Sequence, residues 1–250
     1  MINLKTTREL RYMRDAGKIS QEALLKAGEA VRPGVSTLEL DKIVRRTIEK
    51  AGAVPSFLGY GGFPASACIS VNNVVIHGIP SAHEILKEGD IVSIDVGAIY
   101  EGFNGDNAWT FPCGKVSEEA QKLMDATRES LFLAIEKAVP GNRIGDIGSA
   151  VQQYVEARNY SVVREFVGHG VGAKLHEDPS VPNYGTPGRG VRLFPGMTIA
   201  IEPMVTQGSC EVKILKDGWT TVTKDGKLAA HFEHSIAITP DGPVILTSLD

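Results

Sequence analysis

The stretch DIVSIDVGAIYEGFNGDNAWTF, residues 90–111, decides the fold because it places acidic residues inside two apolar segments joined by a turn. The apolar segments and the glycines within Glu101–Gly105 predict a β-hairpin that turns at these residues. Side chains alternate between the two faces of a strand, so Asp95 shares a face with Ser93. Asp106 lies on the returning strand. The hairpin therefore predicts two carboxylates that face one another across a strand pair.

Four helices are predicted around this hairpin. The pairs Thr6 with Glu9 and Ser36 with Glu39 are capping boxes, each of which marks a helix start. The predicted helices run from Thr6 to about Val31, from Ser36 to Gly52, from Ser117 to just before Pro140, and over roughly 145–158. A Gly- and Pro-rich stretch, which we expect to be irregular, connects the second helix to the hairpin.

This order of elements occurs twice, and the sequence retains a trace of the repeat. Shifting the chain by 107 positions, the interval from Asp95 to Glu202, also places Pro33-Gly34 on Pro140-Gly141. The same offset matches helices, turn and strand, which indicates an α+β fold of two related halves divided near residue 116. The alternative is a coincidence between generic amphipathic helices.

Composition and charge limit the classes of protein to which the chain can belong. Its 250 residues are 42% hydrophobic and 22% charged, which is ordinary for a globular protein. A net charge of −4 without a Lys/Arg block argues against nucleic-acid binding. Three cysteines without a CxxC pair fit a reducing compartment. Neither a signal peptide nor a long apolar run is present, so we expect a cytoplasmic protein with no membrane segment.

Five residues form a candidate metal site. Glu202 is equivalent to Asp95 in the repeat, Glu233 lies in another apolar strand, and His169 lies in the glycine-rich segment EFVGHGVGAKLHEDP, 165–179. Each acid alone is also compatible with a surface position or a buried ion pair. Together with Asp106, four carboxylates would repel one another, whereas two divalent cations would neutralise them. This oxygen-rich set suits Mn²⁺, Fe²⁺ or Co²⁺, and Zn²⁺ also fits.

Several motifs together resemble the type I methionine aminopeptidases of the short bacterial form. They are SIDVGAIYEGFNGD, VGHGVGAKLHEDP, MTIAIEP, HFEHSIAIT and VNNVVIHGIP. The resemblance covers nearly the whole chain. It implies the pita-bread fold, in which a central antiparallel sheet is covered by helices. It also implies one catalytic domain over 1–250, with pseudo-symmetric halves of about 1–116 and 117–250. Gly97, Asn104 and Leu175 depart from residues common in the family, which affects the expected pocket shape and metal preference.

The resemblance also implies a role for each site residue. The metal ligands would be Asp95, Asp106, His169, Glu202 and Glu233. Among them, Asp106 and Glu233 would bridge two ions, with Asp95 on one ion and His169 and Glu202 on the other. The catalytic residues would be His77, His176 and Glu202, with both histidines contacting substrate and Glu202 acting as general base. The methionine pocket would contain Tyr60, Phe63, Cys68 and Trp219, which would be ordinary apolar residues in most proteins.

Two further histidines flank Glu233, and we expect both to lie outside the metal shell. His231 shares a strand face with Glu233, whereas His234 does not. The segment HFEH resembles a metal-binding motif, but its spacing places the two imidazoles on opposite faces of the strand.

The implied activity is dinuclear metal-dependent hydrolysis that releases the N-terminal methionine from nascent proteins and peptides. A small uncharged second residue would be preferred. The enzyme would be a cytoplasmic monomer that acts on chains with a free α-amine, and transient contact with the ribosome is left open. The alternatives are an Xaa-Pro aminopeptidase or prolidase with the same ligands, and a pita-bread binding protein without catalysis. The presence of all five ligand residues argues against the second alternative.

Overall fold

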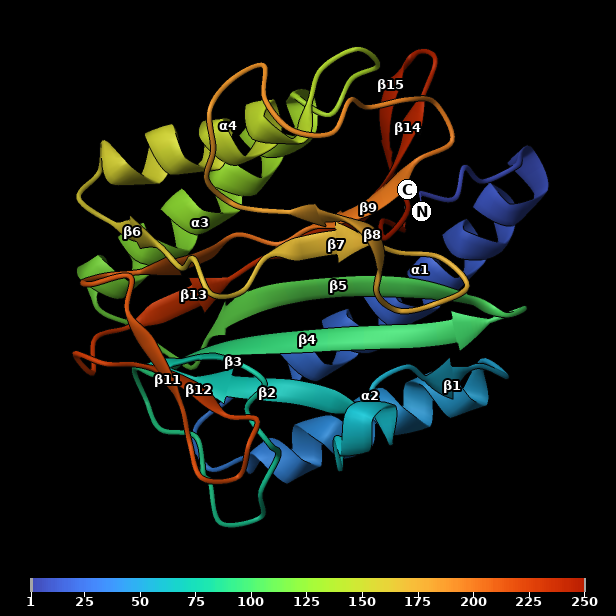
Figure 1. Ribbon diagram of the computed structural model, residues 1–250. Helices are drawn as coiled ribbons and strands as arrows, with labels where there is room; N and C mark the ends of the chain where they lie inside the picture. Colours follow the sequence, from blue (N-terminus) through green and yellow to red (C-terminus); the bar gives the residue numbers. More distant parts are fainter. Residues whose placement is uncertain (1, 250) are drawn as a thin grey trace.

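A curved antiparallel sheet runs through the middle of the molecule in the computed structural model, which describes residues 2–249 (Figure 1). The strands in spatial order are β1 (Val54–Pro55), β4 (Ile91–Tyr100), β5 (Phe103–Pro112), β14 (Glu233–Thr239), β9 (Thr198–Ile201), β7 (Gly168–Gly170) and β8 (Glu177–Val181). In addition, β2 (Ala67–Val71) pairs with β4, and β15 (Gly242–Ile245) pairs with β14. The β5–β14 pairing joins the predicted hairpin to the C-terminal part of the chain.

The predicted hairpin is confirmed, with its turn at Glu101 and Gly102. Gly102 has a φ of 79°, a left-handed conformation that glycine adopts without steric cost. The register places Asp95 opposite Ala108 and Asp106 opposite Gly97. The two carboxylates therefore lie on one face as diagonal neighbours, rather than directly opposite one another as a simple hairpin would suggest.

The four predicted helices are present. They are α1 (Thr7–Glu29), α2 (Thr37–Lys50), α3 (Glu118–Glu136) and α4 (Ile144–Glu156). Thr6 and Ser36 form the predicted capping boxes with Glu9 and Glu39, and Ser117 caps α3 by accepting from the Ala120 N–H. Because a cap satisfies backbone N–H groups within three residues, these boundaries follow from local sequence.

The stretch between α2 and β4 is more ordered than the sequence indicated. The expectation of an irregular segment is wrong there, because β1, β2 and β3 (Val74–Ile76) lie within it. β2 is a short apolar run that is buried throughout and pairs with β4 over five positions, Ala67–Val71. Its strand conformation therefore depends on a distant partner rather than on local alternation.

Two three-stranded sheets complete the described part of the chain, residues 2–249. One contains β13 (Ala229–His231), β10 (Met204–Thr206) and β6 (Ser161–Val162), and the other contains β11 (Val212–Ile214), β12 (Thr221–Thr223) and β3. A 3-10 turn, η1 (Tyr60–Gly62), precedes β2.

Two hydrophobic clusters lie between the helices and the sheet. α1 and α2 contribute Leu24, Leu40 and Ile48 to a cluster with β2 and β4, while α3 and α4 contribute to a second cluster with β9 and β14. Figure 1 shows α1 passing behind β4 and β5. This arrangement leaves the opposite face of the central strands to the acidic residues.

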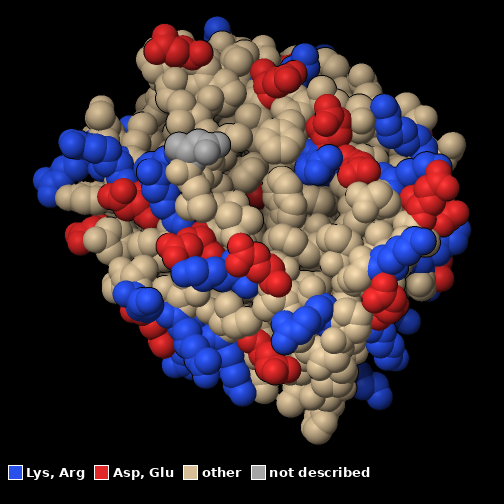
Figure 2. Space-filling model, turned by 180° about the vertical axis from the view of Figure 1, so that it is seen from behind, with Lys and Arg blue, Asp and Glu red and all other residues tan. Residues whose placement is uncertain are grey.

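The surface carries charges of both signs. On the face shown in Figure 2, groups of Lys and Arg side chains lie beside groups of Asp and Glu side chains, with uncharged surface between them. Within residues 2–249, none of the helices combines the length and the apolar character that crossing a bilayer requires.

Candidate metal centre

The predicted acidic ligands converge on one face of the sheet. Asp95 on β4 and Glu233 on β14 both pair with Ala108 of β5, one from each side. Asp106 lies two residues before Ala108 on the same face of β5. Glu202 follows β9, whose last residue pairs with His234 beside Glu233. The small side chain of Ala108 leaves the space between these carboxylates open.

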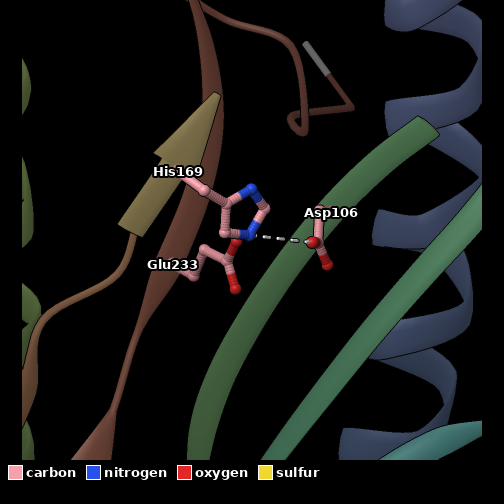
Figure 3. A group of neighbouring side chains, drawn as sticks. All are labelled: Asp106, His169 and Glu233. Carbon is pink, nitrogen blue, oxygen red and sulfur yellow. Dashed lines mark ion pairs between the residues drawn. The ribbon is translucent and has the colours of Figure 1, made fainter. Parts of the chain in front are cut away.

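His169 on β7 completes the group. Its Nε2 lies 3.7 Å from Asp106 Oδ2 and 3.6 Å from Glu202 Oε1. On the other side of the ring, Nδ1 is 2.8 Å from the Gly170 carbonyl oxygen. Because a carbonyl only accepts, Nδ1 must carry the proton, and Nε2 therefore presents a lone pair to the acids. Figure 3 shows His169, Asp106 and Glu233 pointing toward one another from three strands.

The glycines beside His169 allow the strands to approach closely. A Cβ on Gly168 would lie 2.4 Å from the Ala200 carbonyl oxygen, and one on Gly170 would lie 2.2 Å from the Asp178 carbonyl oxygen. Both clashes are with neighbouring backbone. Glycine is therefore required to seat β7 within the sheet, which in turn fixes the position of the imidazole.

The electrostatics of the site fit bound cations. Burial raises the pKa of all four carboxyl groups, and neighbouring acids raise the pKa values of Asp95, Glu202 and Glu233 further. The pKa of Asp106 rises to about 7. Within residues 2–249, Asp95 Oδ1, Asp106 Oδ1 and Glu233 Oε1 are buried without a hydrogen-bond partner. Buried unpaired oxygens are costly, and divalent cations would satisfy them.

The side chains also group as metal ligands do. Ligand atoms of Asp106, His169 and Glu233 lie within 4.8 Å of one another, and so do those of Glu202, His231 and Glu233. Glu233 belongs to both groups. The donor set of carboxylates and imidazole fits divalent cations.

His231 lies closer to these acids than we expected from the sequence. Its Nε2 is 3.7 Å from Glu202 Oε2 and 3.9 Å from Glu233 Oε2, beyond hydrogen-bond range, and it is buried. The sequence contained a signal for the proximity to Glu233, since His231 and Glu233 share a strand face. His234, in contrast, lies away from the site, with its Nδ1 2.9 Å from Thr247 Oγ1.

A cavity of about 140 Å³ adjoins the acids. Its wall includes every predicted substrate residue: Tyr60, Phe63, Cys68, His77, His176 and Trp219. Phe57 and Leu175 also line it; the sequence connected Leu175 with the pocket shape but gave no signal for Phe57. Burial raises the pKa of Cys68 well above its ordinary value, so the thiol stays neutral and serves as an apolar wall. A larger hollow of about 570 Å³ beside α3 and α4 lies apart from these groups.

The two candidate substrate histidines differ in their surroundings. The ring of His176 lies 4.1 Å from that of His169, and its Nδ1 is 2.7 Å from Tyr60 Oη. The ring of His77 packs edge-on against Phe166 and Trp219. Burial lowers the pKa of His77 to about 4, which keeps it neutral. His77 also has a φ of 58°, a strained conformation that clusters at functional sites.

The chain is similar to known metallopeptidases over most of its length. Residues 11–240 match the model of metallopeptidase family M24. The chain is 60% identical over 247 residues to a methionine aminopeptidase of Clostridium perfringens, with 99% of both chains covered. It is 54% identical to methionine aminopeptidase 1 of Bacillus subtilis over 247 residues, again with 99% of both covered. The crystal structure of a methionine aminopeptidase from Thermotoga maritima superposes with a TM-score of 0.98 at 47% identity, covering 99% of this chain and 100% of that one.

Proposed function

The chain belongs to metallopeptidase family M24 and, within it, to the methionine aminopeptidases, and on that premise we propose that it hydrolyses the first peptide bond of polypeptides that begin with methionine. The fold is the pita-bread fold of that family. The observation that carries the proposal is the convergence of four buried or half-buried carboxylates and one imidazole beside an apolar cavity.

The proposed cofactor is a pair of divalent cations, which would be cobalt, manganese, iron or zinc. Asp106 and Glu233 would bridge them, with Asp95 on one ion and His169 and Glu202 on the other. Two features support this assignment: ligand atoms of Asp106, His169 and Glu233 lie within 4.8 Å of one another, and His169 Nε2 also lies 3.6 Å from Glu202 Oε1. When bound, the cations would supply an acidified water and polarise the scissile carbonyl.

The protein's own residues would move the protons. Glu202 would accept the proton that the attacking water loses and return it to the leaving amine. His176 would donate a hydrogen bond to the oxygen of the tetrahedral intermediate. His77, which also lines the cavity, would contact the substrate backbone beyond the scissile bond. The proximity of the His176 and His169 rings and the burial of His77 support these roles.

The cavity supports methionine as the first residue. Phe63, Cys68 and Trp219 present an apolar wall, and the Phe63 and Trp219 rings meet edge-to-face at 5.2 Å. A flexible thioether fits such a slot. The proposed metal centre beside it would be the partner of a free α-amine. The second residue would lie near His77, where bulk would push the scissile carbonyl out of position, so small uncharged residues would be preferred.

A nascent polypeptide with a free N-terminal methionine is the proposed partner. We place the reaction in the cytoplasm, where such chains are made, and assign the enzyme as a monomer in which one chain supplies the whole cavity. A transient contact with the ribosome would bring the enzyme to its substrate.

The test is a peptide panel assayed with metal-reconstituted enzyme. Met-Ala-Ser should release methionine much faster than Met-Lys-Ser, and acetylated Met-Ala-Ser should resist. Equal cleavage of Met-Ala-Ser and Met-Lys-Ser, or rapid cleavage of the acetylated peptide, would contradict the proposed specificity.

Xaa-Pro peptides in the same panel distinguish the alternative enzyme of this fold. The relatives at 60% and 54% identity are named methionine aminopeptidases, which favours methionine release over Xaa-Pro cleavage. We expect slow cleavage of peptides that have proline second and a residue other than methionine first. A preference for these peptides would identify a prolidase-type enzyme instead.

A further inference from the structure

We propose that the Tyr60 hydroxyl fixes the protonation of the His176 ring, so that Nδ1 accepts a hydrogen bond and Nε2 carries the proton offered to substrate. This inference rests on the role proposed above for His176. It assigns Tyr60 as the residue that keeps the proton on Nε2, where that role requires it. Tyr60 would thus be a positioning residue as well as part of the pocket wall.

The contact is made through the hydroxyl. Tyr60 Oη lies 2.7 Å from His176 Nδ1, whereas the ring centroids are 5.3 Å apart and tilted by 36°. A neutral imidazole has one donor and one acceptor nitrogen. With Nδ1 engaged by Tyr60, Nε2 is the nitrogen left to meet substrate. A phenol hydroxyl donates readily to an imidazole nitrogen, and this direction leaves Nε2–H as the donor.

The neighbouring histidine, His169, has a different kind of hydrogen-bond partner at its Nδ1. His169 has its Nδ1 2.8 Å from a carbonyl oxygen, which can only accept, so its Nε2 is bare and suited to a metal. His176 has its Nδ1 next to a hydroxyl that can donate. The two rings are 4.1 Å apart, yet their Nδ1 partners assign opposite tautomers. One imidazole is thereby prepared to bind metal and the other to donate to substrate.

The loop that carries Tyr60 is held by its own backbone. The Gly59 N–H donates to the Phe63 carbonyl at 2.8 Å, and the Phe63 N–H donates to the Tyr60 carbonyl at 2.9 Å. Gly59 and Gly62 adopt left-handed conformations, with φ of 82° and 90°. Tyr60 itself is 45% exposed, so burial does not explain a tyrosine at this position. Its hydroxyl contact with His176 does.

The segment that carries His176 is held without Tyr60. The Asn104 side-chain amide donates to the carbonyls of Gly172 and Ala173, at 3.0 and 3.3 Å. The Lys174 N–H donates to Glu177 Oε1 at 3.1 Å. Because these bonds fix the backbone, removing the Tyr60 hydroxyl should release the imidazole without moving the loop.

The first experiment compares Tyr60→Phe, His176→Ala and the double variant, all loaded with Co²⁺ and assayed with Met-Ala-Ser. Tyr60→Phe keeps the ring of the pocket wall, and we expect kcat to fall about tenfold, as for the loss of a group that orients a functional histidine. Metal content should stay at the wild-type value. In the His176→Ala background, adding Tyr60→Phe should cost nothing more, because its effect passes through the missing ring.

The matched control is Tyr12→Phe, which removes a hydroxyl that accepts from Arg8 Nε on α1, away from the cavity. It should leave kcat unchanged. An equal fold-loss from Tyr60→Phe in both backgrounds would overturn the inference, and so would no loss in either. If His176→Ala itself retains full kcat, the proposed role of His176 fails instead, so the two failures are distinguishable.

The second experiment reads the tautomer directly. In ¹⁵N-histidine-labelled, Zn²⁺-loaded protein, the chain's six histidines can be resolved, and the His176 signals identified by their loss in His176→Ala. We expect Nε2 to be protonated and Nδ1 bare in the wild type, with the two tautomers mixing in Tyr60→Phe. A protonated Nδ1 in the wild type would overturn the inference whatever the kinetics show.

Discussion

Each carboxylate of the proposed metal centre is unfavourable in its ionised form until a cation binds. Burial and mutual repulsion raise the pKa values of these acids, so in the metal-free protein some of them hold protons near neutral pH. His169 shows the opposite behaviour, since burial lowers its pKa to about 4 and leaves the imidazole neutral. The centre is therefore a set of ligands in which the acids, and not the imidazole, compete with protons for metal.

This competition predicts a pH dependence of metal binding. A raised carboxyl pKa means that protons must leave before the cation binds, so affinity for Mn²⁺ should fall as pH decreases from about 7 to about 5. The fall should be about tenfold per pH unit for each proton released. Titration calorimetry in two buffers with different ionisation enthalpies counts the protons. A constant affinity with no proton release would contradict the raised pKa values.

The histidines of the cavity should separate catalysis from metal binding. His77→Ala and His176→Ala remove groups proposed to contact substrate, so kcat should fall by about 10²–10⁴. Metal content, measured by elemental analysis of dialysed protein, should remain that of the wild type. If either variant instead loses its metal, that histidine is a ligand and the assignment is wrong.

At the scale of elements, the sequence predicts helices better than strands because caps are local and strand partners are distant. The boxes at Thr6 and Ser36 located two helix starts correctly. The strand character of β2 escaped prediction because it depends on pairing with β4. The 107-residue repeat remains a prediction, although the α1–α2 and α3–α4 pairs each pack in a separate cluster.

The site residues, like the secondary-structure elements, could be predicted only in part from the sequence pattern. Acids inside apolar strands are conspicuous because their burial is costly, so Asp95 and Glu202 could be identified from patterning. Their ligand roles and the pocket residues came from the resemblance to a known family. The nearness of His231 to Glu202 was missed, since it depends on the pairing of β10 with β13, which places Met204 opposite His231.

Close approach between α1 and the hairpin yields a stability prediction. A Cβ on Gly105 would lie 2.3 Å from the Gly17 backbone nitrogen, so Gly105→Ala must push α1 away from β5. We expect a loss of about 1–3 kcal/mol in the free energy of unfolding by urea. The control is Gly185→Ala, whose nearest neighbour would lie at 3.3 Å, with an expected change within about 0.5 kcal/mol. If Gly105→Ala lowered the free energy of unfolding no more than Gly185→Ala does, the clash would be relieved without cost.

At the scale of the whole molecule, metal binding and folding should be coupled, because the ligands come from strands far apart in sequence. β4, β5, β7 and β14 meet in one sheet, and a cation bound to their side chains stabilises only the folded state. Ligand at about 100 times its Kd contributes about 2.7 kcal/mol per site. The centre is thus expected to join the halves of the chain as well as to carry the chemistry.

Thermal unfolding tests this coupling. Adding Mn²⁺ to metal-stripped protein should raise Tm by about 5–10 °C for each site filled, given the size of the chain. Asp106→Asn, which removes a proposed bridging ligand, should abolish most of the rise, whereas His77→Ala should keep it. A rise of equal size in Asp106→Asn would show that the stabilising ion binds elsewhere.

The most direct test of the central claim is the release of free methionine from Met-Ala-Ser by one protein sample in three states: as purified, after exhaustive chelation, and after addition of Co²⁺ or Mn²⁺. Chelation should abolish release, and the added metal should restore it. Undiminished methionine release by the metal-free protein, or no release in any metal-loaded state, would contradict a metal-dependent methionine aminopeptidase.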